Sequence, residues 1–136
     1  GKVVRSWDQT HSLKTGFSWK NGRWDISSAL EVHTGWPENR LIPAYPMNPD
    51  GSTSLELSTT RRNERRYPHF ASLDFRAART VDVRRGELTA FLEVTNILNR
   101  SNPCCVEYSL NSGGELAART SHWLPIVPSL GVVWRF

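Results

Sequence analysis

Long hydrophobic runs are absent from this sequence of 136 residues. No stretch approaches the roughly 18 apolar residues that a membrane-spanning helix needs, so a helical membrane protein is excluded. Cysteine is scarce as well, since the chain has only two, the adjacent Cys104 and Cys105. Adjacent cysteines lack the C-x-x-C spacing of a zinc site. They either close a strained vicinal disulfide in an oxidising compartment or remain free, and we expect a structural or incidental role for them.

Motifs that carry chemistry are equally scarce. The segment Gly16–Lys20 lacks the second glycine of a nucleophile elbow, and the segment Asn48–Glu56 departs from the ligand pattern of a calcium loop. The histidines lack metal-ligand spacing; they are His11, His33, His69 and His122. There is no phosphate-binding glycine loop and no nucleic-acid motif. We therefore expect no enzyme, no metal, no cofactor and no nucleic-acid partner.

Charge of one sign is not dominant, because 17 basic residues oppose 13 acidic ones for a net charge of +4. The basic residues gather at one place, where Arg61, Arg62, Arg65 and Arg66 lie within a polar segment. Such a cluster is a candidate site for an anionic small molecule, such as a siderophore carboxylate or a phosphate. The alternatives are a solvated loop tip and contact with lipid phosphate groups.

What the sequence does contain is alternation. At the carboxyl end, Leu130, Val132, Trp134 and Phe136 fall on one side of an extended chain, opposite small or polar residues. The same period of two recurs in four earlier segments. The sequence therefore predicts an antiparallel all-β protein with five strands, at Gln9–Lys20, Arg23–Gly35, Phe70–Val83, Leu88–Leu98 and Ile126–Phe136.

The predicted connections alternate between short and long. Asn21-Gly22 predicts a type I′ hairpin turn and Arg84–Glu87 a second short turn, whereas Trp36–Tyr67 and Arg100–Trp123 are predicted to be long loops without strands. A membrane barrel has this arrangement, with tight turns on one side and long loops on the other. Aromatic residues at the strand ends would form its girdles; they are Trp19, Trp24, Trp36, Tyr67 and Trp123.

Alternation alone leaves two interpretations open. In the first, the apolar faces meet lipid; because the smallest membrane barrels have about eight strands, five strands would then be one segment of a longer chain. In the second, the chain is a soluble all-β carbohydrate-binding module whose tryptophans stack on sugars. That module would bury a two-sheet core formed by Leu13, Phe17, Ile26, Leu30, Leu73 and Phe75.

Four motifs occur in the order typical of one family. Trp7-Asp8-Gln9-Thr10-His11 resembles the "D-Q-R-H" motif before a late barrel strand of TonB-dependent outer-membrane receptors. Tyr67–Arg76 resembles their "Y-x-R-L-D-L-R" strand, and Phe91–Arg100 is similar to their "v-x-N-L-F-N-R" segment. Leu130–Phe136 resembles their terminal strand. The resemblance covers nearly the whole chain.

The resemblance implies that residues 1–136 are the carboxyl-terminal part of a transmembrane barrel of about 22 strands, with short periplasmic turns and long extracellular loops. It implies the outer membrane of a Gram-negative bacterium and uptake of a scarce nutrient such as a siderophore–iron complex. The plug domain and the contact with the TonB energy-coupling complex would lie upstream. Lipid, a small-molecule ligand and the barrel-assembly machinery would be further partners, the last recognising Leu130, Val132, Trp134 and Phe136.

Overall fold

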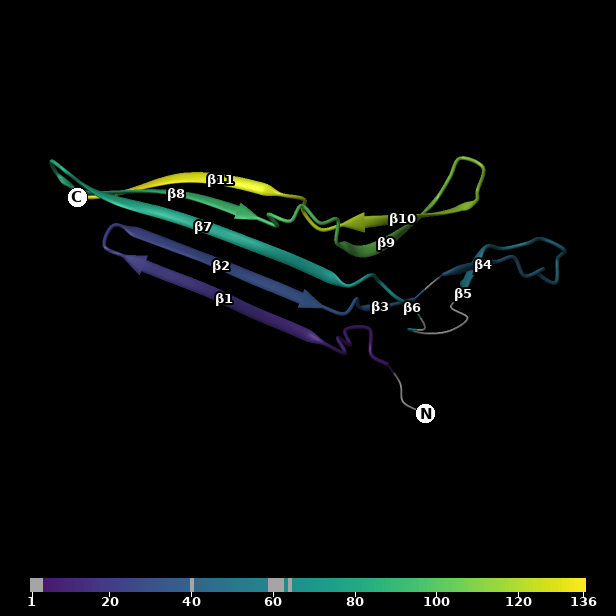
Figure 1. Cartoon of the computed structure of the whole chain (residues 1–136). Helices are drawn as coiled ribbons and strands as arrows, with labels where there is room; N and C mark the ends of the chain where they lie inside the picture. The colour runs from purple at the N-terminus through teal and green to yellow at the C-terminus, as the bar shows by residue number, and fades with distance from the viewer. Residues whose placement is uncertain (1–3, 40, 59–62, 64) are drawn as a thin grey trace.

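The computed structural model describes residues 4–39, 41–58, 63 and 65–136, which form an all-β structure without a helix. Five long strands make one antiparallel sheet in the order β1-β2-β7-β8-β11 (Figure 1). Their bounds are β1 Ser12–Asn21, β2 Trp24–His33, β7 Phe70–Val83, β8 Gly86–Thr95 and β11 Val127–Arg135. The five predicted strands are therefore confirmed, and the third has the bounds that the alternation predicted.

The short turns differ from the prediction by one residue. Asn21 pairs with Trp24, so the central residues of the first turn are Gly22 and Arg23, not Asn21-Gly22. Gly22 has a φ of 53° and Arg23 has no positive φ, which fits a turn with glycine at its first central position rather than type I′. In the second turn Val83 pairs with Gly86. A Cβ on Gly86 would lie 1.9 Å from the carbonyl oxygen of Arg135, so only glycine fits there.

The two long connections are not free of strands, which corrects the prediction. In the first, β3 (Pro37–Glu38) pairs with β6 (Arg65–Arg66), and β4 (Ile42–Ala44) pairs with β5 (Glu56–Ser58). In the second, β9 (Pro103–Leu110) and β10 (Leu116–His122) form an antiparallel hairpin. Asn111 closes this hairpin by accepting the backbone N–H groups of Gly113 and Glu115 with its side-chain oxygen.

The fourth strand ends earlier than predicted. It stops at Thr95 rather than Leu98, because Asn96 and Asn99 have φ angles of 51° and 48°. Asparagine tolerates this left-handed conformation, which cannot continue a strand. The N–H of Asn99 donates to the carbonyl of Asn96 at 2.8 Å, so these residues form a turn.

The register gives the sheet one apolar and one polar face. Residues that lie directly opposite each other share a face, and one row across the five strands reads Trp19, Ile26, Ala77, Leu92, Leu130. The neighbouring row on the other face reads Ser18, Ser27, Arg76, Glu93, Ser129. Alternation along each strand is thus preserved across the whole sheet.

No second layer covers this sheet among the residues that the structure describes. Ala78 is the only buried apolar residue of the five strands, whereas Leu13 and Phe17 are 57% and 60% exposed. The chain exposes 10412 Å², compared with about 7,200 Å² for a compact monomer of the same mass. The two-sheet core that a soluble carbohydrate-binding module requires is not formed by these residues.

The two ends of the sheet differ. Both short turns and the carboxyl terminus lie at one end, and the small sheets of the long connections lie at the other (Figure 1). This arrangement agrees with the predicted separation of short turns from long loops. In the part of the chain that the structure describes, no helix has the length and apolarity needed to cross a membrane.

Candidate functional site

The apolar face of the sheet is the largest candidate surface. On β11, Leu130 is 83% exposed and Val132 is 65% exposed, and Phe136 beyond the strand is 97% exposed. The residues predicted to be recognised in assembly, Leu130, Val132, Trp134 and Phe136, thus project from the last strand of the sheet. That strand pairs with β8 on one edge, and its other edge has no partner among the described residues. It therefore offers both an apolar row and a free strand edge.

Three tryptophans lie on the apolar face at the short-turn end of the sheet. Trp19 and Trp24 are each 42% exposed on the apolar face, and Trp134 is 55% exposed there. The indole N–H of Trp134 donates to the carbonyl of Arg85 at 3.1 Å, and its ring meets Phe136 edge-on at 5.7 Å. An indole with an apolar body and a satisfied N–H is typical of a boundary between lipid and water.

At the long-loop end the aromatic residues lie differently. His33 belongs to the polar face and is 3% exposed. The Phe70 ring stacks on it with centroids 4.7 Å apart, and the Trp36 ring meets it at a tilt of 48° with centroids 4.8 Å apart. Trp123 lines a hollow on that same face. Tyr67 is half-buried, and burial raises its pKa above the ordinary value. The girdle stays a prediction for all five residues, of which Trp19 and Trp24 lie on the apolar face and Trp123 lines a hollow on the polar face.

The polar face is satisfied by contacts between neighbouring strands. Lys14 and Glu31 are directly opposite and form an ion pair of 2.7 Å, and Arg76 lies 3.9 Å from its opposite residue Glu93. The Phe91 ring covers Gly131, where a Cβ would lie 2.2 Å from the ring. Neighbouring strands thus place opposite charges side by side, and an aromatic ring fills the space above Gly131.

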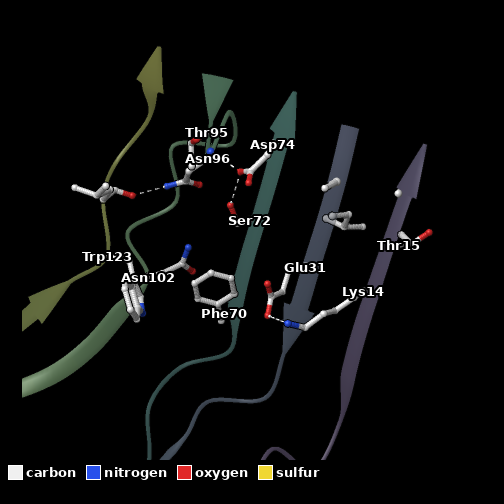
Figure 2. Close-up of a pocket in the computed structure, with 14 residues that line it drawn as sticks. Lys14, Thr15, Glu31, Phe70, Ser72, Asp74, Thr95, Asn96, Asn102 and Trp123 are labelled. Carbon is white, nitrogen blue, oxygen red and sulfur yellow. Dashed lines mark hydrogen bonds and ion pairs between the residues drawn. The ribbon is translucent and has the colours of Figure 1, made fainter. Parts of the chain in front are cut away.

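A hollow of about 600 Å³ lies on the polar face towards the long-loop end (Figure 2). Lys14 and Glu31 lie on one side of it, and Phe70 and Trp123 on another. Between them are polar groups, among which Asp74 accepts a hydrogen bond from the Ser72 hydroxyl at 3.0 Å. The hollow thus combines aromatic surface with a carboxylate and an ion pair, which suits a polar ligand or another protein segment.

Three asparagines that follow β8 were missed by the sequence analysis, and two of them, Asn96 and Asn102, line this hollow. Asn96 is 3% exposed; its side chain donates to the carbonyls of Arg100 and Leu124 and accepts the N–H of Arg100. Asn102 is 1% exposed and exchanges two hydrogen bonds with the backbone of Ala71. Asn99 accepts the N–H of Ile126.

One of these asparagines, Asn102, replaces strand pairing on β7, while Asn96 and Asn99 hold the chain that follows β8 and precedes β11. β8 reaches only to the level of Phe75, so the part of β7 from Phe70 to Asp74 has no strand on that side. The Asn102 amide satisfies the N–H and the carbonyl of Ala71 instead, and the N–H of Ile97 donates to the carbonyl of Leu73 at 2.8 Å. The spacing of three residues between the asparagines, directly after a strand, was the available signal.

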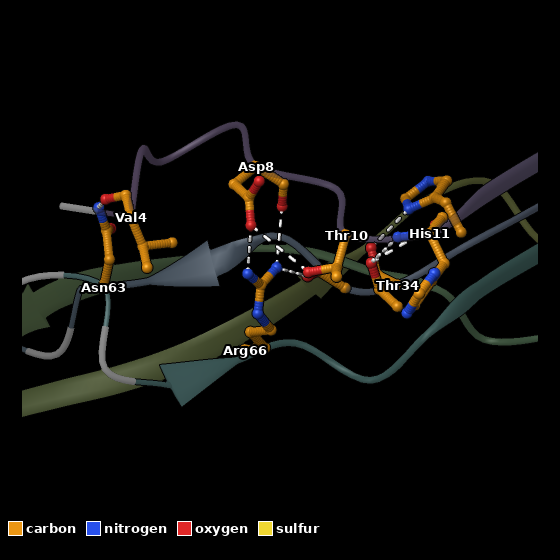
Figure 3. A network of polar contacts seen from close by, with 9 residues as sticks. Val4, Asp8, Thr10, His11, Thr34, Asn63 and Arg66 are labelled. Carbon is orange, nitrogen blue, oxygen red and sulfur yellow. Dashed lines mark hydrogen bonds and ion pairs between the residues drawn. The ribbon is translucent and has the colours of Figure 1, made fainter. Parts of the chain in front are cut away.

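The structure describes two of the four arginines of the predicted ligand site. Arg61 and Arg62 lie outside the described residues. Arg66 forms an ion pair with Asp8 and donates to the backbone carbonyls of Asp8 and Gly35, at 2.9 Å and 3.1 Å (Figure 3). Arg66 therefore fastens the segment before β1 to the first long connection. Arg65 is exposed on β6, and its role in ligand binding remains a prediction.

The adjacent cysteines lie at a β-bulge in the second long connection. Cys105 pairs with Ser121, but His122 pairs with Pro103, so Cys104 is the extra residue. A bulge turns two successive side chains towards the same side, which explains why the two Sγ atoms lie 2.6 Å apart. Among the described residues, no group of three metal-ligating side chains occurs here or elsewhere.

No protein-family model, no curated protein and no solved structure matches the chain.

Proposed function

We propose that this chain forms part of the wall of a transmembrane β-barrel in the outer membrane, in a receptor of the TonB-dependent type. The observation that carries the proposal is the apolar face, which extends over five strands with Arg79 as its one charged residue and has no covering layer among the described residues. Lipid acyl chains are the partner that a broad apolar sheet face of this kind requires. The residue motifs that resemble the family support the same reading.

The open edges of the sheet support a larger barrel. β1 and β11 each pair on one side only in the described sheet. In lipid an unpaired strand edge leaves N–H and C=O groups without partners, at several kcal/mol for each group. Further strands of the same protein would pair with both edges and close the barrel.

The polar face and the long connections would then serve uptake. The polar face would line the lumen, where the hollow beside Asp74 and Trp123 faces an upstream plug or a ligand passing through. The long connections, with Arg65 on β6, would contribute to capture of a small anionic nutrient at the outer mouth. Release inward would follow movement of the plug, driven by the TonB complex. Wall residues in this scheme hold the shape of the pore and carry out no chemistry.

The proposal is tested by locating the protein made from its own gene. We expect it in the outer-membrane fraction, with a faster electrophoretic mobility before boiling than after it, as a folded barrel shows. Deleting the gene, or disrupting TonB, is expected to abolish high-affinity uptake of one scarce nutrient. A protein found in a soluble fraction, with one mobility irrespective of boiling, would contradict the proposal.

A further inference from the structure

Arg79 is the one charged residue on the apolar face of the described sheet. The register places it between Trp24 of β2 and Ala90 of β8, in a row that continues to Val132 of β11. All other charged residues of the five strands lie on the polar face or at strand ends. An exposed guanidinium amid apolar side chains calls for an explanation that neither the fold nor transport supplies.

Within the described residues, Arg79 has an aromatic partner but no anion. Its guanidinium carbon lies 5.3 Å from the centre of the Trp24 ring, within the range of a cation–π contact. Arg76, three residues earlier on the same strand, faces the other way and has Glu93 opposite it at 3.9 Å. No ion pair or side-chain hydrogen bond joins Arg79 to the residues that the structure describes. Its five N–H donors are therefore available to a ligand.

We propose that Arg79 binds the phosphate group of a glycerophospholipid in the membrane leaflet at the short-turn end. This inference rests on the proposed function, because it requires the apolar face to meet lipid. A guanidinium binds a phosphate through two parallel N–H···O hydrogen bonds. The apolar face has no carboxylate side chain among its described residues that would compete for these N–H donors. The ring of Trp24 fixes the guanidinium in place, so less side-chain freedom is lost on binding.

The position of Arg79 along the strand fits a headgroup. It lies four residues before the end of β7 at Val83, or about 13 Å along the strand. A long arginine side chain extends from that depth towards the membrane surface. On the lipid face the cost of an arginine falls from about 2–4 kcal/mol at the midplane to about 0–1 kcal/mol near the interface. A phosphate partner offsets what remains.

The surroundings of Arg79 leave room for acyl chains. Ala90 is directly opposite it, and Ala77 precedes it by two residues on the same face. These short side chains form a shallow strip that leads from Arg79 towards the centre of the sheet, flanked by Ile26 and Leu92. A lipid with its phosphate at Arg79 would lay a chain along this strip.

The test is native mass spectrometry of the protein made from its own gene, purified in a maltoside detergent and titrated with phosphatidylglycerol. Arg79→Gln is expected to weaken binding of the first lipid about fivefold, since one arginine near a membrane surface contributes roughly that factor. Arg76→Gln is the matched control and is expected to bind as the wild type does. Arg79→Lys keeps the charge and is expected to retain most of the affinity.

Two results would overturn the inference. One is equal lipid binding by the Arg79→Gln and Arg76→Gln variants; the other is displacement of the lipid by millimolar inorganic phosphate, which would make the site one for free phosphate. A nitroxide spin label attached at position 130 after Leu130→Cys separates the two proposals. If that label is in lipid and the variants bind equally, only the Arg79 inference fails. If the label is in water, both proposals fail.

Discussion

The two faces of the five-stranded sheet use the same backbone in opposite ways. On the polar face, side chains satisfy one another, as Lys14 and Glu31 do at 2.7 Å. On the apolar face, Leu130 and Val132 are 83% and 65% exposed and have no covering layer in the described chain. Since all hydrogen bonds of the ladder are common to both faces, the difference lies in the side chains alone. The side chains of the polar face find partners within the described residues, whereas those of the apolar face need a partner from outside them.

The largest effect is expected from placing a charge on each face in turn. Leu130→Arg should lower the free energy of unfolding in lipid vesicles by about 2–4 kcal/mol, because Leu130 lies near the middle of β11. Ser129→Arg, on the polar face of the same strand, should change it by less than about 0.5 kcal/mol. Denaturant titration in vesicles measures both. Equal effects of the two substitutions would remove the distinction between the faces.

A smaller effect is expected at Asn96, whose buried side chain holds the turn after β8 to the segment before β11. Asn96→Ala should lower the free energy of unfolding by about 2–3 kcal/mol, because it leaves the N–H of Arg100 and the carbonyls of Arg100 and Leu124 without their hydrogen-bond partner. Asn111→Ala, in the exposed hairpin turn, is the control and should cost about 0.5 kcal/mol. The same vesicle titration applies. If Asn96→Ala were as mild as the control, the amide network would not stabilise the fold.

Contact between Phe91 and Gly131 on the polar face is tested by a double-mutant cycle. Gly131→Ala should cost about 1 kcal/mol, because its Cβ meets the Phe91 ring, which must shift. In a Phe91→Ala background the same substitution should cost close to zero, giving a coupling energy of about 1 kcal/mol. Additive effects would mean that the ring does not lie over Gly131.

The smallest effect is expected from the ion pair between Lys14 and Glu31. Both side chains are substantially exposed, at 66% and 38%, so solvent screens the pair. Alanine substitutions at both positions, singly and together, should give a coupling energy of about 0.5 kcal/mol or less, and 1 M salt should remove it. A coupling several times larger would show that this face is less hydrated than its exposure indicates.

Much of the sheet was predictable because a strand of period two records its two faces directly. The bounds of β7 and the separation of short turns from long loops follow from the sequence. The turn at Gly22 was displaced by one residue, because register depends on pairing with a partner strand that the local sequence does not show.

The long connections and the site beside them were harder to predict. The hairpin of β9 and β10 was missed although Val106, Tyr108 and Leu110 alternate with Glu107 and Ser109, because so short an alternating run beside polar residues also fits a loop. The role of Asn96 and Asn102 depends on backbone groups that lie 28 and 31 residues away in sequence. The ion pair of Arg66 with Asp8 could not be predicted, because the two residues are 58 apart in sequence and only the fold brings them together.

The central claim is tested most directly by nitroxide scanning along β11 in lipid vesicles, in a background with Cys104→Ser and Cys105→Ser. We expect labels at 130, 132 and 134 to collide with oxygen, which dissolves in lipid, and labels at 129, 131 and 133 to collide with a water-soluble nickel chelate. An alternation of this kind would place the apolar face in acyl chains. Labels at 130, 132 and 134 that are shielded from both reagents, or reached by nickel, would contradict the account.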